Sequence, residues 1–295
     1  MRVVPILMYH EIATRSQTAS RLAVPPGVFA AQLAFLHAEG FTTLTASALA
    51  AAVTDGTAAR GTVTDGTVAG GAVAGGAVAG GGPTRRAGSL PARPVVLTFD
   101  DGFADFHREA LPLLQHYGFT ATLFVTTGWI HDAGPYAAGR MPGRMLSWSQ
   151  ILEAADSGVE VGAHSHRHPQ LDQLADADLR RELRSSMALL EDRLGRAVPG
   201  MAYPFGYSNA RVRRVAAAVG HRYACVVANV PGGPAWEPFA LPRLTIRRST
   251  RPDLFAQIMC GRSPHLIFIK DRTLTKAWAG VRRSRAVLRG VSRNA

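Results

Sequence analysis

Short apolar runs alternate with helical segments along most of this 295-residue chain, and that alternation restricts the folds that it can form. After residue 93, stretches of helical periodicity separate strand-like runs at 95–99, 120–125, 159–163, 201–203, 223–227 and 241–246. Two similar runs, at 3–8 and 41–45, come earlier in the chain. This β-α-β-α order predicts a parallel sheet, closed or open, with catalytic residues at the carboxyl ends of its strands.

One segment interrupts the alternation. After a short predicted helix at 46–53, residues 54–93 consist mostly of Gly, Ala, Val and Thr, with GGAVA repeated. No large apolar side chain occurs there before Leu90, so burial cannot offset the entropy lost on ordering. We therefore predict a disordered Gly/Ala-rich insertion at 54–93. A repeat architecture is the alternative, but the repeat is too short and lacks apolar anchors.

The positive charge is concentrated at one end of the chain. The formal net charge is +12, and residues 270–295 contain eight Lys or Arg and one Asp, a net charge of +7. The charge therefore belongs to a tail and not to a nucleic-acid-binding body, and no nucleic acid is expected as a partner. We predict one domain at 1–260 and a basic tail at 261–295. A solvated tail is the simpler interpretation, and a helix at 278–289 lying on anionic lipid is the alternative.

The sequence contains no run of 18 or more apolar residues, so no membrane span is expected. The first apolar run ends at Tyr9, His10 and Glu11 without a small-residue cleavage site, which favours a strand over a signal peptide. We therefore expect a cytoplasmic protein, with membrane association only through the tail. Cys225 and Cys260 are too few for a disulfide framework, and we expect two buried thiols.

Polar residues directly follow four of the predicted strands. They are His10 after 3–8, Asp100 and Asp101 after 95–99, the run 164–169 (HSHRHP) after 159–163, and Pro204-Phe205-Gly206 after 201–203. The carboxyl ends of parallel strands share one face, so these groups are expected to meet. Two adjacent buried carboxylates are costly unless something neutralises them. A divalent metal held by histidines and one aspartate would supply that counter-charge.

The histidine spacing supports a metal site. His164 and His168 are four residues apart, which places both rings on one side of a turn, whereas His166 should point elsewhere. Two histidines and one aspartate leave a coordination position open, the pattern of a catalytic zinc site. One aspartate can bind the metal while its neighbour acts as a general base. The alternative is that the Asp-Asp-Gly sequence is only a tight turn.

Three motifs together resemble those of the polysaccharide deacetylases, the NodB-homology or carbohydrate esterase family 4 group. They are TFDDG at 98–102, HSHRHP at 164–169 and AYPFG at 202–206. The resemblance covers roughly residues 1–53 and 94–250. It implies a distorted (β/α) barrel of about seven strands and metal-dependent removal of acetyl groups from N-acetylated sugars.

The resemblance also implies roles for individual residues. Asp100 corresponds to the general base, and the metal ligands correspond to Asp101, His164 and His168. The substrate side of the site corresponds to Tyr203, Pro204 and Phe205, with the Phe205 N–H helping to hold the oxyanion. Zinc is the expected metal, although such ligands also accept cobalt, nickel or iron.

Two departures from the family pattern need replacements. Met201 to Tyr203 stand where the family has an Arg that steadies the base, and Arg243 on a neighbouring strand is our hypothesis for its substitute. The C-terminal Leu-Xxx-His motif is missing, because its nearest counterpart carries Lys270. The N-terminal sequence LMYH at 7–10 instead resembles the permuted arrangement of poly-N-acetylglucosamine deacetylases. We therefore expect His10 to be the general acid.

The expected reaction is hydrolysis of N-acetyl groups on an N-acetylglucosamine-containing polysaccharide or oligosaccharide, which releases acetate. Deacetylation of a small N-acetylated sugar conjugate is one alternative. A non-catalytic carbohydrate-binding barrel and a purely structural metal domain are two more. A broad groove bordered by Trp129, Trp148 and Trp236 would favour a polymer, although core packing is the simpler role for each tryptophan.

Overall fold

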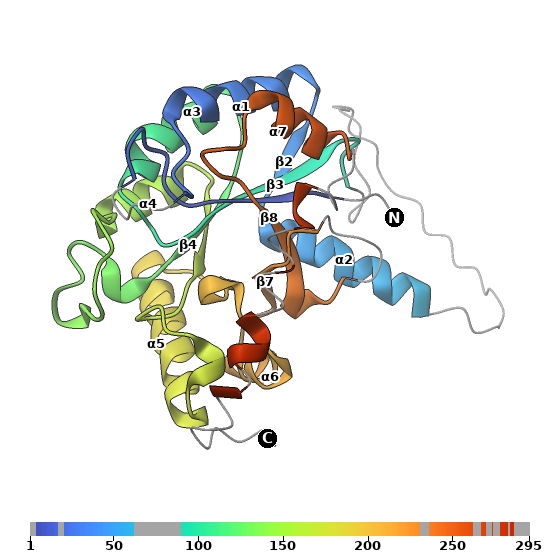
Figure 1. Cartoon of the computed structure of the whole chain (residues 1–295). Coiled ribbons are helices and arrows are strands. Elements are labelled where there is room, and N and C mark those ends of the chain that lie inside the picture. Colours follow the sequence, from blue (N-terminus) through green and yellow to red (C-terminus); the bar gives the residue numbers. More distant parts are fainter. Residues whose placement is uncertain are drawn as a thin grey trace, which may run out of the picture.

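A parallel β-barrel forms the centre of the molecule (Figure 1). The computed structural model describes residues 4–16, 21–61, 90–230, 236–261, 267–269, 273, 278–282 and 284–285. The strands are β1 (Ile6–Tyr9), β2 (Thr42–Leu44), β3 (Pro94–Phe99), β4 (Thr122–Val125), β5 (Glu160–Ala163), β6 (Gly200–Ala202), β7 (Tyr223–Val227) and β8 (Leu241–Thr245). They lie in the order β1-β8-β7-β6-β5-β4-β3-β2, and a pairing of β1 with β3 closes the barrel and leaves β2 outside it.

Helices connect the strands and cover the barrel. The α-helices are α1 (Pro26–Ala38), α2 (Ala46–Gly61), α3 (Leu111–His116), α4 (Trp148–Asp156), α5 (Asp176–Leu194), α6 (Ala210–Val219) and α7 (Pro252–Met259). Shorter helical turns are η1 (Phe106–Ala110), η2 (Thr127–Trp129), η3 (Gly134–Tyr136), η4 (Leu171–Gln173), η5 (Pro204–Gly206) and η6 (Pro238–Ala240). In Figure 1, α1, α3 and α7 lie together on one side and α5 lies beside α6 on another.

The strands are buried on both faces, which explains their continuous apolar sequences. Every residue of β3 is buried, and its side chains alternate between two layers. Val96 belongs to the cluster that fills the barrel lumen, together with Ile6 and Phe124. Leu97 and Phe99 point the other way and pack in the layer beneath the helices.

The amino end of the lumen is closed by α2 and a hydrogen-bonded carboxylate. Leu49 of α2 packs into the lumen cluster. The Glu160 carboxylate accepts hydrogen bonds from the Tyr223 hydroxyl at 2.8 Å, the Thr122 hydroxyl at 2.8 Å and the Ser47 backbone N–H at 3.1 Å. The Ser47 N–H lies in the first turn of α2, where backbone N–H groups have no partner within the helix. This end of the barrel is therefore both packed and hydrogen-bonded.

The distorted (β/α) barrel of about seven strands is confirmed. The predicted helix at 46–53 was too short, because α2 continues to Gly61 through part of the predicted insertion. The added part, TDGTAARG at 54–61, contains two Gly and two Thr, so intrinsic helix propensity does not predict this extension. The rest of that insertion, 62–89, lies outside the described residues. β3 already begins at Pro94.

Other expectations can be compared with the described residues. Cys225 is buried as expected, but Cys260 is exposed, because it caps the carboxyl end of α7 at the surface. Among the described residues, no helix is both long enough and apolar enough to span a bilayer. Phe268 and Arg282 are buried, so the segment predicted as a solvated tail is in part packed against the barrel.

Candidate active site

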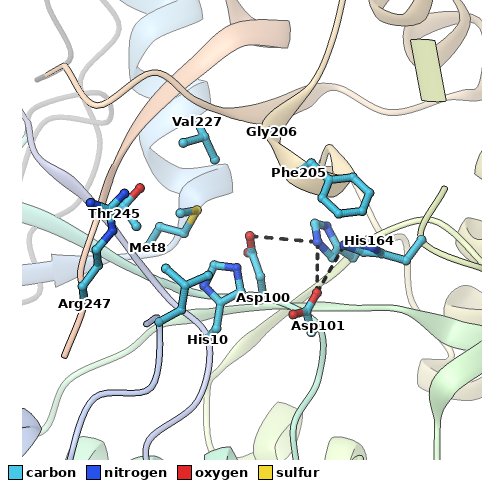
Figure 2. Close-up of a pocket in the computed structure, with 12 residues that line it drawn as sticks. Met8, His10, Asp100, Asp101, His164, Phe205, Gly206, Val227, Thr245 and Arg247 are labelled. Atoms are coloured by element: carbon cyan, nitrogen blue, oxygen red, sulfur yellow. Dashed lines mark ion pairs between the residues drawn. The ribbon is translucent and has the colours of Figure 1, made fainter. Parts of the chain in front are cut away.

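The polar residues that follow β1, β3, β5 and β6 meet at the carboxyl end of the barrel (Figure 2). They border a cavity of about 300 Å³. Six of the nine residues singled out in the sequence line it: His10, Asp100, Asp101, His164, His168 and Phe205. The motifs that are distant in sequence therefore form one site.

Asp101, His164 and His168 form a compact set of metal-ligand atoms. Asp101 Oδ1 lies 3.4 Å from His164 Nε2 and 3.4 Å from His168 Nε2. Ligands bonded tetrahedrally to zinc at about 2.1 Å stand about 3.4 Å apart, so the spacing suits such an ion. Asp101 Oδ1 is buried and accepts no hydrogen bond from the described residues, which leaves it available to a cation. The donor set therefore fits a divalent metal.

Hydrogen bonding orients His164 for this purpose. Its Nδ1 lies 2.8 Å from the Ala202 carbonyl oxygen at the end of β6. A carbonyl oxygen only accepts, so Nδ1 carries the hydrogen and the Nε2 lone pair faces Asp101. This contact between β5 and β6 fixes both the tautomer and the direction of the ring.

Burial and the neighbouring charges hold two of the three candidate ligands, Asp101 and His168, in their metal-binding forms. Burial alone would raise the pKa of Asp101, but the neighbouring His164, together with His10 and His168, holds it below its usual value. Burial, aided by the neighbouring His164, lowers the pKa of His168 to about 4. At neutral pH, Asp101 is therefore an anion and His168 is neutral with a free lone pair.

Left-handed backbone conformations gather at the site. Asp101, Ser165, His168 and Phe205 have φ of 74°, 62°, 58° and 59°. Among the described residues, Asn229 is the only other non-glycine residue with positive φ. Each such conformation costs on the order of 1–3 kcal/mol and persists only where the surroundings impose it. A hydrogen bond of 3.0 Å from the His168 N–H to the Ser165 hydroxyl is one such restraint.

Asp100 is held by Arg243, the residue that the sequence suggested as its partner. Arg243 is fully buried and donates to Asp100 Oδ1 at 2.6 Å and to Oδ2 at 2.7 Å. Such bidentate pairs fix both the position and the charge of a carboxylate. Burial by itself would raise the pKa of Asp100, but Arg243 outweighs it and the pKa lies below its usual value. Asp100 is therefore an ionised carboxylate beside the metal-ligand set.

His10 and Phe205 form further walls of the cavity. His10 follows β1 and lies across the cavity from His164 (Figure 2). Its Nδ1 is buried and has no hydrogen-bond partner among the described residues. Phe205 is 49% exposed, and its ring meets that of His168 at 4.5 Å between centroids.

The structure does not bring Tyr203 or Pro204 to the cavity. Both are buried, and the Tyr203 hydroxyl donates to the Phe239 carbonyl at 3.2 Å. The reason is strand alternation, because Ala202 belongs to the lumen cluster and Tyr203 therefore faces the outer layer. Tyr203 contributes through its backbone, since its carbonyl accepts the Gly206 N–H at 2.8 Å and closes the turn that carries Phe205.

The remaining candidates divide between the site and the core. His166 points away from the ligand set, and its Nδ1 lies 2.9 Å from the Thr127 hydroxyl. The ring of Trp129 packs against His168 at 4.9 Å. Trp148 is buried in the layer beneath the helices, and Trp236 packs against the lumen cluster. Only Trp129 therefore borders the site.

Two polar residues of the cavity were not identified from the sequence. Thr245 and Arg247 line the cavity, and they follow Arg243 at intervals of two residues. Alternation along β8 was the signal that could have identified them. They belong to no family motif, and their distance in sequence from the other site residues concealed them.

Comparisons with known proteins agree with this arrangement. Residues 87–224 match the family model described as polysaccharide deacetylase. YxkH of Bacillus subtilis (strain 168), provisionally named a polysaccharide deacetylase, is 25% identical over 247 residues, which cover 82% of this chain and 71% of that protein. A poly-β-1,6-N-acetyl-D-glucosamine N-deacetylase of Staphylococcus aureus (strain MSSA476) is 23% identical over 171 residues, which cover 55% of this chain and only 57% of that protein. The solved structure of the Streptococcus pyogenes deacetylase PplD in complex with acetate matches with 26% identity and a TM-score of 0.69, covering 88% of this chain and 98% of that one.

Proposed function

We propose that the chain, which carries a polysaccharide deacetylase domain, is a metal-dependent hydrolase of acetylated sugars. Its proposed reaction removes N-acetyl groups from an oligosaccharide or polysaccharide containing N-acetylglucosamine. The observation that carries this proposal is the juxtaposition of two differently held aspartates. Asp101 offers an unpartnered oxygen to a cation, and Asp100 is held as an anion beside it by Arg243.

The ligands proposed for the metal are Asp101, His164 and His168. A divalent ion held by these residues would polarise the acetamide carbonyl and lower the pKa of its bound water to about 7. Zinc suits two imidazoles and one carboxylate with an open position, and cobalt, nickel or iron are further candidates.

The other steps are assigned to side chains around the cavity. Asp100 accepts a proton from the attacking water, and Arg243 keeps it ionised and aligned for that purpose. The Phe205 N–H donates to the oxygen that becomes negative as water adds. One such donor lowers the activation free energy by about 3–4 kcal/mol. His10 then gives a proton to the sugar nitrogen as the carbon–nitrogen bond breaks. The products are acetate and a free amine on the sugar.

The surroundings of the site favour an oligosaccharide over a small conjugate. A second cavity of about 430 Å³ adjoins the first and shares His10, Asp101, His168 and Phe205 with it. Trp129 borders this second cavity. Space on this side of the proposed metal ligands can hold a sugar unit next to the one that is deacetylated, and aromatic rings pack well against sugars.

Acetate release tests the proposal. The purified chain is stripped with a chelator, reloaded with one metal at a time, and given N-acetylglucosamine and its oligomers of increasing length. We expect release that requires metal and rises with length. Release from the monosaccharide or small conjugates alone would favour the small-molecule alternative, and stoichiometric zinc binding with no release from any of them would refute the proposed reaction.

The Asp100→Asn variant is the matched control. It preserves the shape of the side chain but removes the proposed proton acceptor, and its NH2 group replaces one of the two oxygens that accept from Arg243. We expect zinc binding as in the wild type and at least about a 10³-fold loss of turnover, the upper part of the usual range for general-base catalysis. Near wild-type turnover would show that Asp100 is not the base.

A further inference from the structure

The C-terminal segment reaches the loops that carry the site. Arg282 lies 110 residues after Asp172 in the chain, yet its side chain contacts Asp172 and is only 5% exposed. Its Nε donates to Asp172 Oδ2 at 2.9 Å. Its carbonyl oxygen accepts a hydrogen bond of 3.1 Å from the Gln173 side chain. Arg282 is therefore anchored to η4, which begins three residues after His168.

The same guanidinium also covers an aromatic ring beside the cavity. Its central carbon lies 3.3 Å from the centroid of the Tyr207 ring. Cations over the face of an aromatic ring are attracted to it, and the attraction grows when both groups are shielded from water. Arg282 thus joins η4 to the residue that follows η5.

A chain of ring contacts leads from Arg282 to the proposed metal site. The Tyr207 ring stacks on Phe205, with centroids 5.6 Å apart and planes 26° from parallel. Phe205 in turn meets His168 edge-on at 4.5 Å. Phe205 is half exposed and has a left-handed backbone conformation, which persists only where the surroundings impose it. Its side chain is therefore held less firmly than that of a buried core residue.

We propose that Arg282 is a positioning residue: it clasps the loops after β5 and β6 and, through Tyr207, holds Phe205 as a fixed wall of the substrate cavity. The segment predicted to be a free tail is then part of the substrate-binding architecture. This inference rests on the proposed function in taking Phe205 as the substrate wall. The other positive charges of this segment have no part in the proposed clasp. Arg285, which is exposed, therefore provides a matched control.

Four single variants test the clasp. Arg282→Ala removes the cation, Tyr207→Leu removes the ring without leaving a charge unpaired, Tyr207→Phe keeps the ring, and Arg285→Ala removes a neighbouring positive charge. We expect the first two to raise KM about fivefold to tenfold with kcat within about twofold, because they loosen the Phe205 ring, whereas the hydrogen bond from the Gly206 N–H to the Tyr203 carbonyl still holds the turn and the Phe205 N–H. Tyr207→Phe and Arg285→Ala should retain the wild-type KM.

A binding measurement separates this inference from the proposed reaction. Calorimetry on the zinc-loaded full chain with Asp100→Asn reports binding of an N-acetylglucosamine tetramer without turnover. Adding Arg282→Ala or Tyr207→Leu to that background should weaken binding about fivefold or more, and the two together should weaken it no further than either alone. If both lower thermal stability but leave KM and tetramer binding at the values of Arg285→Ala, the clasp is only structural and the inference is overturned.

Discussion

The two ends of the barrel each hold a carboxylate, and the protein treats them in opposite ways. At the amino end, Glu160 accepts hydrogen bonds from Tyr223, Thr122 and Ser47. At the carboxyl end, Asp101 has a buried oxygen that accepts none from the described residues, on a backbone with φ of 74°. The first carboxylate is satisfied by the fold, whereas the second is held in place at a cost to the fold.

The difference separates a structural carboxylate from one that is kept for a ligand. A buried polar atom without a partner costs about 1–3 kcal/mol, and a charged one costs more. Local strain adds to that cost at Asp101 but not at Glu160. In barrels of this kind the carboxyl end holds the active site and the amino end supports stability, which matches the contrast.

The largest expected effect comes from Asp101→Asn. Asparagine keeps the shape and tolerates positive φ, but it removes the anionic oxygen that we assign to the metal. We expect zinc affinity to fall at least about 100-fold and acetate release at least about 10³-fold, while the metal-free protein is no less stable than the wild type. Zinc titration followed by activity assay checks this, and undiminished zinc affinity would remove Asp101 from the ligand set.

A smaller loss is expected for His10→Gln at the same end of the barrel. If His10 is the acid, its removal should lower kcat about 100-fold, within the range for general-acid catalysis, and leave zinc affinity unchanged. Kinetics at saturating metal give the comparison. Unchanged kcat would assign proton delivery to another group, and a fall in zinc affinity would place His10 among the ligands.

At the opposite end, Glu160→Gln should change stability and not chemistry. The side-chain NH2 group cannot accept the hydrogen bonds that one carboxylate oxygen accepts, so part of the network is lost. We expect the free energy of unfolding to fall by about 1–3 kcal/mol, with activity per folded molecule within about twofold of the wild type. Denaturant unfolding beside kinetics checks both, and a loss of activity with unchanged stability would reverse the assignment of the two ends.

The smallest effect should come from His221, which lies in neither cavity. Burial lowers the pKa of His221 to about 4, so the folded protein binds fewer protons than the unfolded chain between pH 4 and about 6.5. Stability contributed by neutral His221 is therefore complete above about pH 6.5 and is lost as the pH falls toward 4, by on the order of 2–3 kcal/mol.

His221→Gln should flatten this part of the stability profile, and the same change at the exposed His116, His116→Gln, serves as its control. Denaturant unfolding at several pH values between 4 and 7 gives both profiles. A slope in His221→Gln equal to that of His116→Gln would show that His221 does not contribute to the pH dependence.

The residues that sequence analysis could place are those whose position follows from local pattern. Apolar runs ending in polar residues indicated the barrel strands, and the shared edge of parallel strands brought Asp100, Asp101, His164 and His168 together. Tyr203 was expected at the site because it belongs to a family motif. Alternation along β6 turns its side chain outward instead. The prediction also ended α2 too early, because the Gly and Thr residues at 54–61 are poor helix formers and gave no local signal that the helix continues.

Other features had no local signal. Arg282 lies in a basic stretch that is typical of a solvated tail, and only the folded chain places it against Asp172 and Tyr207. The hydrogen-bond partners of Glu160 come from three separate segments, and nothing in the sequence around it distinguishes it from a surface glutamate. Contacts of this kind depend on tertiary packing, which periodicity does not encode.

The most direct test of the contrast is the change in melting temperature that zinc produces in the wild type, Glu160→Gln and Asp101→Asn. At a zinc concentration about 100 times the Kd, binding to the folded state alone contributes about 2.7 kcal/mol, a rise of roughly 5–10 °C for a chain of this size. We predict the same rise in the wild type and in Glu160→Gln, which starts from a lower melting temperature, and a rise of no more than about 1 °C in Asp101→Asn. An equal rise in Asp101→Asn would contradict the account, because the unpartnered carboxylate would then not be the one that binds the metal.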